Sequence, residues 1–503
     1  MYECPEHWGM RRVNRNHWDR TMHTKDEPAI NNPSPDPDRW KIFWVVAAGI
    51  FMSTLDSSIV NIALPMIKAE LLLSLAAAEW IVMAYLLAVT SLLLGFGRLS
   101  DMVGHRRIYL TGLSVFSAGS LFCALSGNGA FLVLSRGIQG VGASMIMACT
   151  QALVVGAFPT HERGKALGMN GAVVSIGLTA GPILGGYLVE QFNWQAIFWI
   201  NIPIGMVTAV FAGRLIPEYP REQREKDRFD GVGCLLLASS LCALLMLLSH
   251  GHAWGWRSPR IAMWSVLVTV FLWAFIRWEK TMATPLVPPA IFRVRLFVLP
   301  VAAGSLMFIT LFSIVFLMPF YLTHAAGYTV GEAGRLMTIL FGCLFIGAPL
   351  SGSLSDIMGS RTLCAAGMLL LSAALFLMGR LTADSSVFSI GWRLALAGMG
   401  VAVFISPNTA AVMSALPPHQ LGIAGGMVAT ARNFGMILGI ALAGTLFGTT
   451  FSRLTGGQPL DPFTDSLIAP FMQAFRVAVA GGGSVGLIGV MVSFARGPET
   501  RRK

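Results

Sequence analysis

The most regular feature of the chain is a succession of long apolar runs, separated by short segments that carry most of the charge. A helix needs about 20 residues to cross about 30 Å of hydrocarbon, and fourteen runs come near that length. The pattern predicts an all-α, polytopic membrane protein with fourteen transmembrane helices. The expected spans cover residues 42–66, 80–96, 108–125, 130–153, 166–189, 196–216, 232–248, 261–276, 296–321, 330–354, 362–379, 387–414, 423–447 and 468–494.

Two connections between spans repeat one another. Residues 97–106 read GRLSDMVGHR after the second run, and residues 352–361 read GSLSDIMGSR after the tenth. Both fit G-x-L-S-D-x-x-G-x-R, so the first six and the last six runs are two copies of one unit, with two runs inserted between them. Two facing helical bundles are typical of transporters that alternate access around a site near the bilayer midplane. A duplicated bundle without transport is the alternative.

The repeat divides the chain into five parts. Residues 41–216 are expected to form an N-terminal six-helix bundle, 217–295 a linker with two extra transmembrane helices, and 296–495 a C-terminal six-helix bundle. Residues 1–40 are polar, which predicts a disordered cytoplasmic tail and not a secretory signal peptide. Residues 496–503 are expected to form a second cytoplasmic tail.

Composition excludes a soluble multidomain enzyme. Hydrophobic residues make up 54% of the chain and charged residues only 12%, whereas a soluble protein has about 25% charged residues. The net charge of +11 comes from lysines and arginines at both termini and in alternate connections. The positive-inside rule then places both termini in the cytoplasm. The expected location is the inner (plasma) membrane. The same distribution argues against nucleic acid as a partner.

Cysteine usage predicts neither a disulfide framework nor a metal site. Six of the seven cysteines lie inside apolar runs, and no two have C-x-x-C spacing. They are expected to be small buried hydrophobic residues. No metal and no cofactor is predicted.

One acid stands well inside a span. Asp56 lies roughly 15 Å below the outer end of the first run, and Arg136 lies roughly 9 Å deep in the fourth, at about 1.5 Å per residue. The two side chains can meet if their helices are neighbours. Desolvation favours the protonated acid while a nearby arginine favours the carboxylate, and these opposed effects suit a group that binds and releases protons. A helix–helix hydrogen bond without coupling is the alternative reading of Asp56.

The repeated connection predicts a conformational latch at the cytoplasmic ends of the spans. Its glycines allow a tight turn, its acid can accept bonds from arginines or from a helix N-terminus, and its arginines hold it at the cytoplasmic leaflet. A topology anchor alone is the alternative. The residues concerned are Gly97, Asp101, Gly104, Arg106 and Arg107 in the first copy, with Asp356 and Arg361 in the second.

The fifth run is rich in glycine around one proline. Pro182 removes a helix hydrogen bond, and the glycines let another helix approach closely. This pattern predicts a bending gate, with ordinary small-residue packing as the alternative. The gate residues are Gly177, Gly181, Pro182, Gly185 and Gly186.

Together these motifs resemble the major facilitator superfamily, and specifically its fourteen-helix drug:proton antiporter branch (EmrB/QacA-like). Residues 97–107 are similar to the superfamily's signature loop, and residues 132–143 (LVLSRGIQGVGA) to the motif implicated in proton transfer. Residues 177–186 resemble the antiporter motif of exporters, and residues 55–65 the first-helix motif of the branch. The resemblance covers residues 40–496 and implies the major facilitator fold with proton coupling through Asp56 and Arg136.

A substrate cavity is expected as well, and one departure from the family pattern bears on the cargo. Some multidrug members carry an extra acid in the tenth helix, whereas residues 336–354 contain none. This difference puts divalent cations and strongly cationic drugs in doubt as preferred cargo. The expected cavity residues are Asn61, Tyr85, Gln139 and Arg432.

The sequence therefore predicts a proton-coupled antiporter that exports small amphipathic compounds or drugs by alternating access. Export of an endogenous metabolite or siderophore on the same fold stays open, as does a non-transporting sensor or scaffold. A membrane-embedded enzyme is not expected, because the one near cluster of histidines, His250 and His252, is placed in an outside loop. The expected partners are protons, the cargo and the lipid bilayer, with a monomer as the working unit. A periplasmic adaptor and an outer-membrane channel stay open as partners.

Overall fold

The computed structural model describes residues 38–159, 162–218, 230–255, 257–282, 291, 293–416, 421–460 and 462–496. Within these ranges all regular structure is helical, and fourteen helical segments are long and apolar enough to cross a membrane. The predicted fold class and span count are confirmed. The helices are α1 (Arg39–Glu70), α2 (Leu75–Val103), α3 (His105–Ala124), α4 (Gly129–Ala157), α5 (Arg163–Gln191), α6 (Ala196–Trp199), α7 (Asn201–Leu215), α8 (Gly231–Trp254), α9 (Pro259–Thr281), α10 (Arg295–Phe320), the π-helical η3 (Tyr321–Ala325), α11 (Val330–Met358), α12 (Ser360–Met378), α13 (Val387–Ser414), α14 (Leu421–Thr455), the 3-10 helix η5 (Asp465–Leu467) and α15 (Ile468–Phe494).

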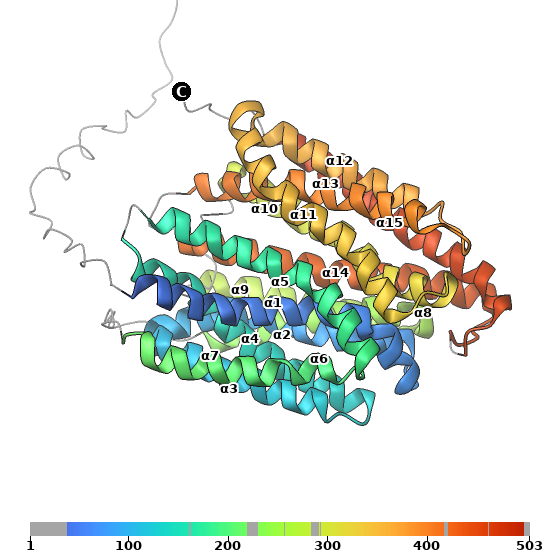
Figure 1. Ribbon diagram of the computed structural model, residues 1–503, viewed down its shortest axis with the longest axis horizontal. Coiled ribbons are helices and arrows are strands. Elements are labelled where there is room, and N and C mark those ends of the chain that lie inside the picture. The colour runs from blue at the N-terminus through green and yellow to red at the C-terminus, as the bar shows by residue number, and fades with distance from the viewer. Residues whose placement is uncertain are drawn as a thin grey trace, which may run out of the picture.

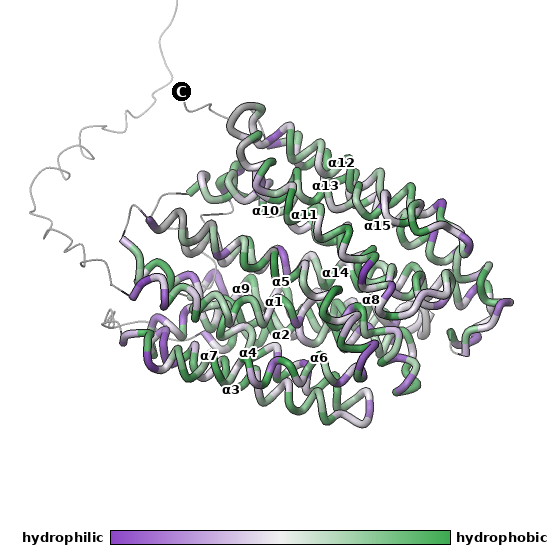
Figure 2. The backbone as a smooth tube through the Cα atoms, viewed as in Figure 1, coloured by the Kyte–Doolittle hydropathy of each residue, from purple (hydrophilic) through white to green (hydrophobic). Residues whose placement is uncertain are grey.

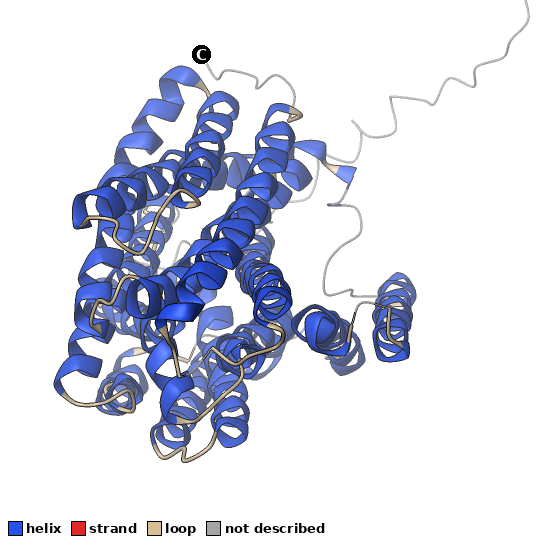
Figure 3. Cartoon of the chain, turned by 90° about the vertical axis from the view of Figure 1, so that its right-hand side faces the viewer, coloured by secondary structure: helices blue, strands red, loops and turns tan. Residues whose placement is uncertain are grey.

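The helices form two groups, with α1–α7 on one side and α10–α15 on the other (Figure 1). The groups meet mainly where α2 packs on α14 and where α5 packs on α11. The inserted α8 packs against both α2 and α14, and α9 packs against α8. Figure 3 shows this pair standing at one side of the bundle. Only 6% of the α9 span is buried within the protein, so most of this helix is left to face lipid.

Apolar and polar residues are distributed along the helices as expected for a protein that spans a membrane. Green apolar positions cover most of the length of each helix, and purple positions gather toward helix ends and connections (Figure 2). The N-terminal end of α1 and the C-terminal end of α15 lie on the same side of the molecule, at the left of Figure 1. We call that side the terminal end and the opposite side the far end.

The duplication seen in the sequence recurs in the packing. Gly104 lies thirty residues after the N-cap Ser74 of α2, and Gly359 lies thirty residues after the N-cap Thr329 of α11. Both glycines have positive φ, +109° and +85°, which a residue with a side chain rarely adopts. Each therefore ends one span and starts the next without a longer loop.

Close packing of the next two helices is duplicated as well. A Cβ atom at Gly142 of α4 would lie 2.7 Å from the Cα of Phe116 in α3, and one at Gly400 of α13 would lie 2.6 Å from the backbone nitrogen of Leu371 in α12. Each glycine stands fourteen residues after the N-cap of its own helix, Asn128 or Ser386. The two bundles therefore use the same small-residue contact at equivalent positions.

Three details of the prediction are wrong. Gly97 lies inside α2 and not in a turn, because Ser100 donates to the Gly97 carbonyl (2.7 Å) and the helix continues to Val103. His250 lies in α8, where it stacks on Trp254 with ring centroids 4.7 Å apart, and not in a loop. Arg496, assigned to the C-terminal tail, is only 3% exposed and donates to Oδ1 of Asn408. The tail predicted for the start of the chain lies, up to residue 37, outside the described residues.

Candidate functional site

A carboxylate is enclosed in the N-terminal bundle by three polar side chains. Asp56 of α1 has no exposed surface. Its Oδ2 accepts a hydrogen bond from Nη1 of Arg136, and its Oδ1 accepts from Nε2 of Gln139 (2.8 Å) and Nδ2 of Asn201 (2.8 Å). These residues come from α1, α4 and α7. The predicted contact between Asp56 and Arg136 is confirmed, while their role in proton coupling stays a prediction.

Arg136 is itself fully buried and held on several sides. Its Nε donates to the Ile81 carbonyl of α2 at 3.0 Å, and its guanidinium lies over the Tyr85 ring, 4.3 Å from the centroid. The Phe198 ring is 5.8 Å away. A buried cation is tolerated where an anion, hydrogen bonds and aromatic faces replace its water. The pair is therefore held in one geometry, and removing either partner would leave a buried charge.

Glycine contacts bring the helices of this site close together. A Cβ at Gly119 of α3 would lie 2.7 Å from the Cα of Gln139, so only glycine lets α3 approach α4 at this level. That approach allows Nε2 of Gln139 to reach Oγ of Ser120 (2.8 Å) as well as Asp56. Gln139 was expected in the substrate cavity, and the structure places it in the carboxylate cluster instead.

Asn201 is a residue of this site that was not among those predicted from the sequence. Its amide donates to Asp56 from a helix 145 positions away in the chain. The available signal was an amide inside an otherwise apolar run, at the first residue of α7. Such a side chain seldom goes without a hydrogen-bond partner when buried.

The predicted gate residues face two different neighbours. A Cβ at Gly181 would lie 2.6 Å from the Cβ of Ser58, and Ser58 donates to the Leu178 carbonyl at 2.9 Å, so this face of α5 lies directly on α1. Gly177 and Gly185 lie on α1 in the same way, against Thr54 and Ile62.

The other face of α5 packs across the bundle boundary, against α11. A Cβ at Gly334 of α11 would contact the carbonyl of Pro182 and would lie 3.0 Å from the Cα of Gly186. Thr179 donates to the Phe341 carbonyl at 3.3 Å. At the far end, Glu190 and Arg335 form an ion pair at 3.7 Å. The far halves of the two bundles are therefore closed on one another along α5 and α11.

The repeated connection makes its described contacts within one bundle. His105 lies 3.7 Å from Asp101, Arg106 donates to the Gly213 carbonyl of α7, and Arg107 lies 3.7 Å from Glu218. These contacts tie the start of α3 to the end of α7. In the second copy, the Arg361 guanidinium lies 5.7 Å from the ring centroid of Phe494, and the side chain of Asp356 lies outside the described residues. Whether the connection acts as a latch stays a prediction.

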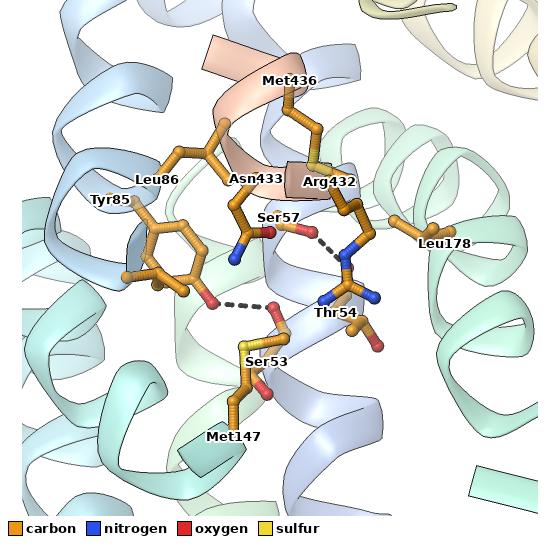
Figure 4. A pocket seen from close by; sticks show the side chains of 11 residues that line it. Ser53, Thr54, Ser57, Tyr85, Leu86, Met147, Leu178, Arg432, Asn433 and Met436 are labelled. Carbon is orange, nitrogen blue, oxygen red and sulfur yellow. Dashed lines mark hydrogen bonds between the residues drawn. The ribbon is translucent and has the colours of Figure 1, made fainter. Parts of the chain in front are cut away.

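A small central cavity lies between the bundles (Figure 4). Its volume of about 10 Å³ leaves room for about one water molecule. Of the expected cavity residues, Tyr85 and Arg432 line it. Asn61 lies elsewhere, donating to the Ser57 carbonyl at 3.0 Å. The lining residues are Ser53, Thr54, Ser57, Tyr85, Leu86, Val89, Met147, Leu178, Arg432, Asn433 and Met436.

Glu79 is a second buried acid, and its burial was not predicted from the sequence. Glu79, near the far end of α2, has no exposed surface. Its carboxyl lies against α14, where a Cβ at Gly444 would be 2.9 Å from Oε2. It was missed because acids at the edge of an apolar run are ordinary at a membrane surface, and only the packing of α2 on α14 buries this one.

In the part of the chain that the structure describes, no group of three or more histidine, cysteine or acidic side chains gathers in a form that could hold a metal ion. The six described cysteines are free thiols.

Comparison with known proteins identifies the class. The model of the Major Facilitator Superfamily matches residues 46–440 and 300–503, and the chain belongs to this family of membrane transporters. It is 35% identical to the riboflavin transporter RibZ of Clostridioides difficile, over 90% of this chain and 97% of that one. It is 34% identical to the tetracenomycin C resistance and export protein of Streptomyces glaucescens, over 82% and 76% of the two chains.

Solved structures agree on the fold. A bacterial homologue of the human lysosomal transporter Spinster, in an inward-facing and occupied conformation, aligns with a TM-score of 0.66 at 15% identity, covering 92% of this chain and 97% of that one. The D-xylose–proton symporter aligns with a TM-score of 0.62 at 13% identity, covering 92% and 98%. At such low identity these likenesses establish the fold alone. The protein is a transporter and not an enzyme.

Proposed function

We propose that this protein is a proton-coupled antiporter of the fourteen-helix drug:proton branch, which moves small amphipathic compounds out of the cell as protons move in. The observation that carries the proposal is the enclosure of Asp56. A fully buried carboxylate beside a fully buried arginine is costly to maintain in a membrane span and is a functional hypothesis by default. The homologous drug resistance and export proteins support an outward direction and a drug-like cargo.

The chemistry of the cluster suits reversible proton binding. As an anion, Asp56 accepts from Arg136, Gln139 and Asn201. Protonation removes the attraction to Arg136, whose bond to the Ile81 carbonyl and contact with the Tyr85 ring remain. A proton therefore changes how α1 is held against α4 and α7.

Cargo and proton can communicate through α1 itself. Ser57, the next residue after Asp56, lines the central cavity together with Ser53 and Thr54 from the preceding turn. A rotation or tilt of α1 that follows protonation therefore moves the cavity wall. The glycine face of α5 lies on the same helix, so α1 also connects the carboxylate to the closed contact between α5 and α11.

The driving force is sufficient for one proton per cargo molecule. A proton crossing about 100 mV gains about 2.3 kcal/mol, and one pH unit adds about 1.4 kcal/mol. For a neutral cargo the sum supports a gradient of several hundredfold, at about 1.4 kcal/mol per factor of ten. A monovalent cation exchanged for one proton uses only the pH term, which gives about tenfold. Neutral or anionic cargo is therefore favoured.

The proposed setting is the inner (plasma) membrane, with the terminal end in the cytoplasm. The bias of lysine and arginine toward the connections of that end supports this orientation. A monomer is the proposed working unit, with no nucleic-acid partner. A periplasmic adaptor and an outer-membrane channel are needed only if the cargo must also cross a second membrane.

The test compares Asp56→Asn with the native protein. Growth-inhibition profiling of cells with and without the protein first identifies a compound that it exports. In reconstituted vesicles the asparagine variant should lose accumulation of that compound against its gradient and lose cargo-induced proton release, while passive equilibration remains. Asp465→Asn, at an exposed position, is the matched control and should behave as native. Normal proton-driven transport by Asp56→Asn at equal protein level contradicts the proposal.

A second candidate is export of an endogenous metabolite on the same fold. Similarity to a riboflavin transporter over 90% of the chain favours it. Comparing intracellular and extracellular metabolites of cells with and without the protein separates it from drug export. An unaltered metabolite profile together with altered drug susceptibility excludes it.

A further inference from the structure

The central cavity has an uneven distribution of polar groups. Its wall on the α14 side carries Arg432 and Asn433, and Figure 4 shows both side chains pointing toward α1 and Tyr85. Arg432 is half-buried, and its guanidinium group lies beside Thr54 and Ser57 in the view. None of the residues that line the cavity is an acid.

The hydroxyl groups of the opposite wall have already donated their hydrogens. Ser53 donates to the Gly49 carbonyl (2.9 Å), Thr54 to the Ile50 carbonyl (2.8 Å) and Ser57 to the Thr54 carbonyl (2.7 Å). The Tyr85 hydroxyl donates to the Ser53 carbonyl at 2.8 Å.

The donor capacity left in the cavity belongs to α14. Nδ2 of Asn433 is buried without a hydrogen-bond partner among the described residues, and the whole side chain is only 3% exposed. Leaving a buried donor unsatisfied is destabilising, so a ligand that accepts a hydrogen bond from Nδ2 of Asn433 gains affinity. Arg432 adds a positive charge and five N–H groups beside it. Both point to a ligand that accepts hydrogen bonds.

The negative charge of Asp56 does not offset this preference. Its two oxygens are bonded to Arg136, Gln139 and Asn201, on the side of α1 that faces α4 and α7. A cationic drug in the cavity would meet Arg432 without a facing carboxylate. Its exclusion would follow from like-charge repulsion in a poorly solvated space.

We propose that Arg432 and Asn433 form the head-group subsite of the cargo cavity, which takes an anionic or carbonyl-rich group of a planar aromatic compound. A carboxylate, phenolate or imide accepts from the guanidinium and from Nδ2 of Asn433. The ring system packs among Tyr85, Met147 and Met436, whose aromatic and thioether groups adapt to flat apolar surfaces. This assignment rests on the proposed export function, of which it specifies the cargo class.

The position of the subsite also explains how a cavity of water size could serve a larger molecule. Arg432 and Asn433 belong to the C-terminal bundle, whereas Ser53, Thr54 and Tyr85 belong to the N-terminal one. Separation of the bundles widens the cavity while each wall keeps its own chemistry. The cargo can then bridge the two walls, with its head on α14 and its ring against α1 and α2.

The test uses two dyes with the same tricyclic xanthene ring and opposite charge, fluorescein and rhodamine 123. Their binding to the purified full-length protein in detergent is followed by fluorescence anisotropy, with protein-free micelles as background. The native protein should bind fluorescein more tightly than rhodamine 123. Arg432→Gln should weaken fluorescein binding about tenfold or more, the size expected for a lost charge-assisted hydrogen bond. Arg432→Lys should retain part of the affinity, and Asn433→Ala should weaken it severalfold.

Arg453→Gln is the matched control, because this arginine is exposed near the far end of the same helix. It should leave both affinities unchanged, and size-exclusion profiles check that each variant is folded. Equal or tighter binding of rhodamine 123 by the native protein, an unchanged fluorescein affinity in Arg432→Gln, or absence of saturable fluorescein binding overturns the proposal. Since binding needs no proton gradient, uphill transport by Asp56→Asn would overturn the antiport mechanism and leave this subsite standing.

Discussion

The amide of Asn201 donates a hydrogen bond of 2.8 Å to Oδ1 of Asp56, although 145 positions separate the two residues in the chain. The bond joins α7 to α1 at the level where α4 contributes Arg136 and Gln139. Three helices of one bundle therefore share a single carboxylate. A change in the charge of this carboxylate alters the contacts between α1, α4 and α7. Binding of a proton here would therefore affect how these helices of the bundle pack together.

Removal of the cation should be costly in both stability and coupling. Arg136→Ala leaves a buried carboxylate without its partner, and loss of one member of a buried pair typically costs about 3–5 kcal/mol. Thermal unfolding in detergent should therefore occur at a lower temperature, and cargo-induced proton release in vesicles should be lost. The double variant Asp56→Asn with Arg136→Ala should be more stable than the sum of the two single losses predicts, because no charge is left unpaired, but it should stay uncoupled. If the two single losses simply add in the double variant, the pair is not the source of the effect.

The glycine face of α5 should tolerate no large side chain. In Gly181→Leu the new Cβ alone would lie 2.6 Å from Ser58 Cβ, so α5 and α1 must separate. We expect the variant in the membrane at near-native amount with transport strongly reduced, measured as uptake into inverted vesicles. Ile183→Leu, two positions along at a 45% exposed site, is the control and should transport normally. Pro182→Leu should also impair transport, and native activity in both Gly181→Leu and Pro182→Leu would reduce the segment to ordinary packing.

The far end should have to open during transport. Oε2 of Glu190 and Nη1 of Arg335 lie 3.7 Å apart across the contact between α5 and α11. In a cysteine-free background, cysteines at both positions joined by a short thiol-reactive cross-linker should abolish transport, and a cleavable linker should restore it on reduction. Each single cysteine variant treated with the same reagent is the control. Full transport by the cross-linked protein would show that these ends do not separate.

The orientation can be measured with impermeant thiol reagents. In intact cells a cysteine at Ser258, at the N-cap of α9, should be labelled from outside. A cysteine at Gln223, which lies outside the described residues and falls between the sixth and seventh predicted spans, should be labelled only after the membrane is opened. Labelling of both positions from the same side would be incompatible with fourteen spans and with the insertion of the α8–α9 pair.

Several features of this protein could be predicted because they depend on local sequence. Span number follows from runs of apolar residues long enough to cross a bilayer, and the structure contains the same fourteen. The duplication follows from two nearly identical connections, and the positive φ of Gly104 and Gly359 from the need for an abrupt reversal between spans. Even the contact between Asp56 and Arg136 could be expected, because helical rise places them roughly 15 Å and roughly 9 Å deep, a difference that a long arginine side chain can span.

Other features depend on how each helix is rotated and which neighbour it meets, and hydropathy carries little of that information when most faces are apolar. Asn201 joins the carboxylate, Glu79 is buried on α14, and Arg496 leaves the expected tail to contact Asn408. Gly97 stays helical because the hydrogen bonds of α2 continue to its end. The unsatisfied donor of Asn433 is of the same kind, since it exists only where two bundles enclose a cavity. The role of a buried polar group depends on the partners that it contacts, which are often far away in the chain. Only close packing in three dimensions selects those partners.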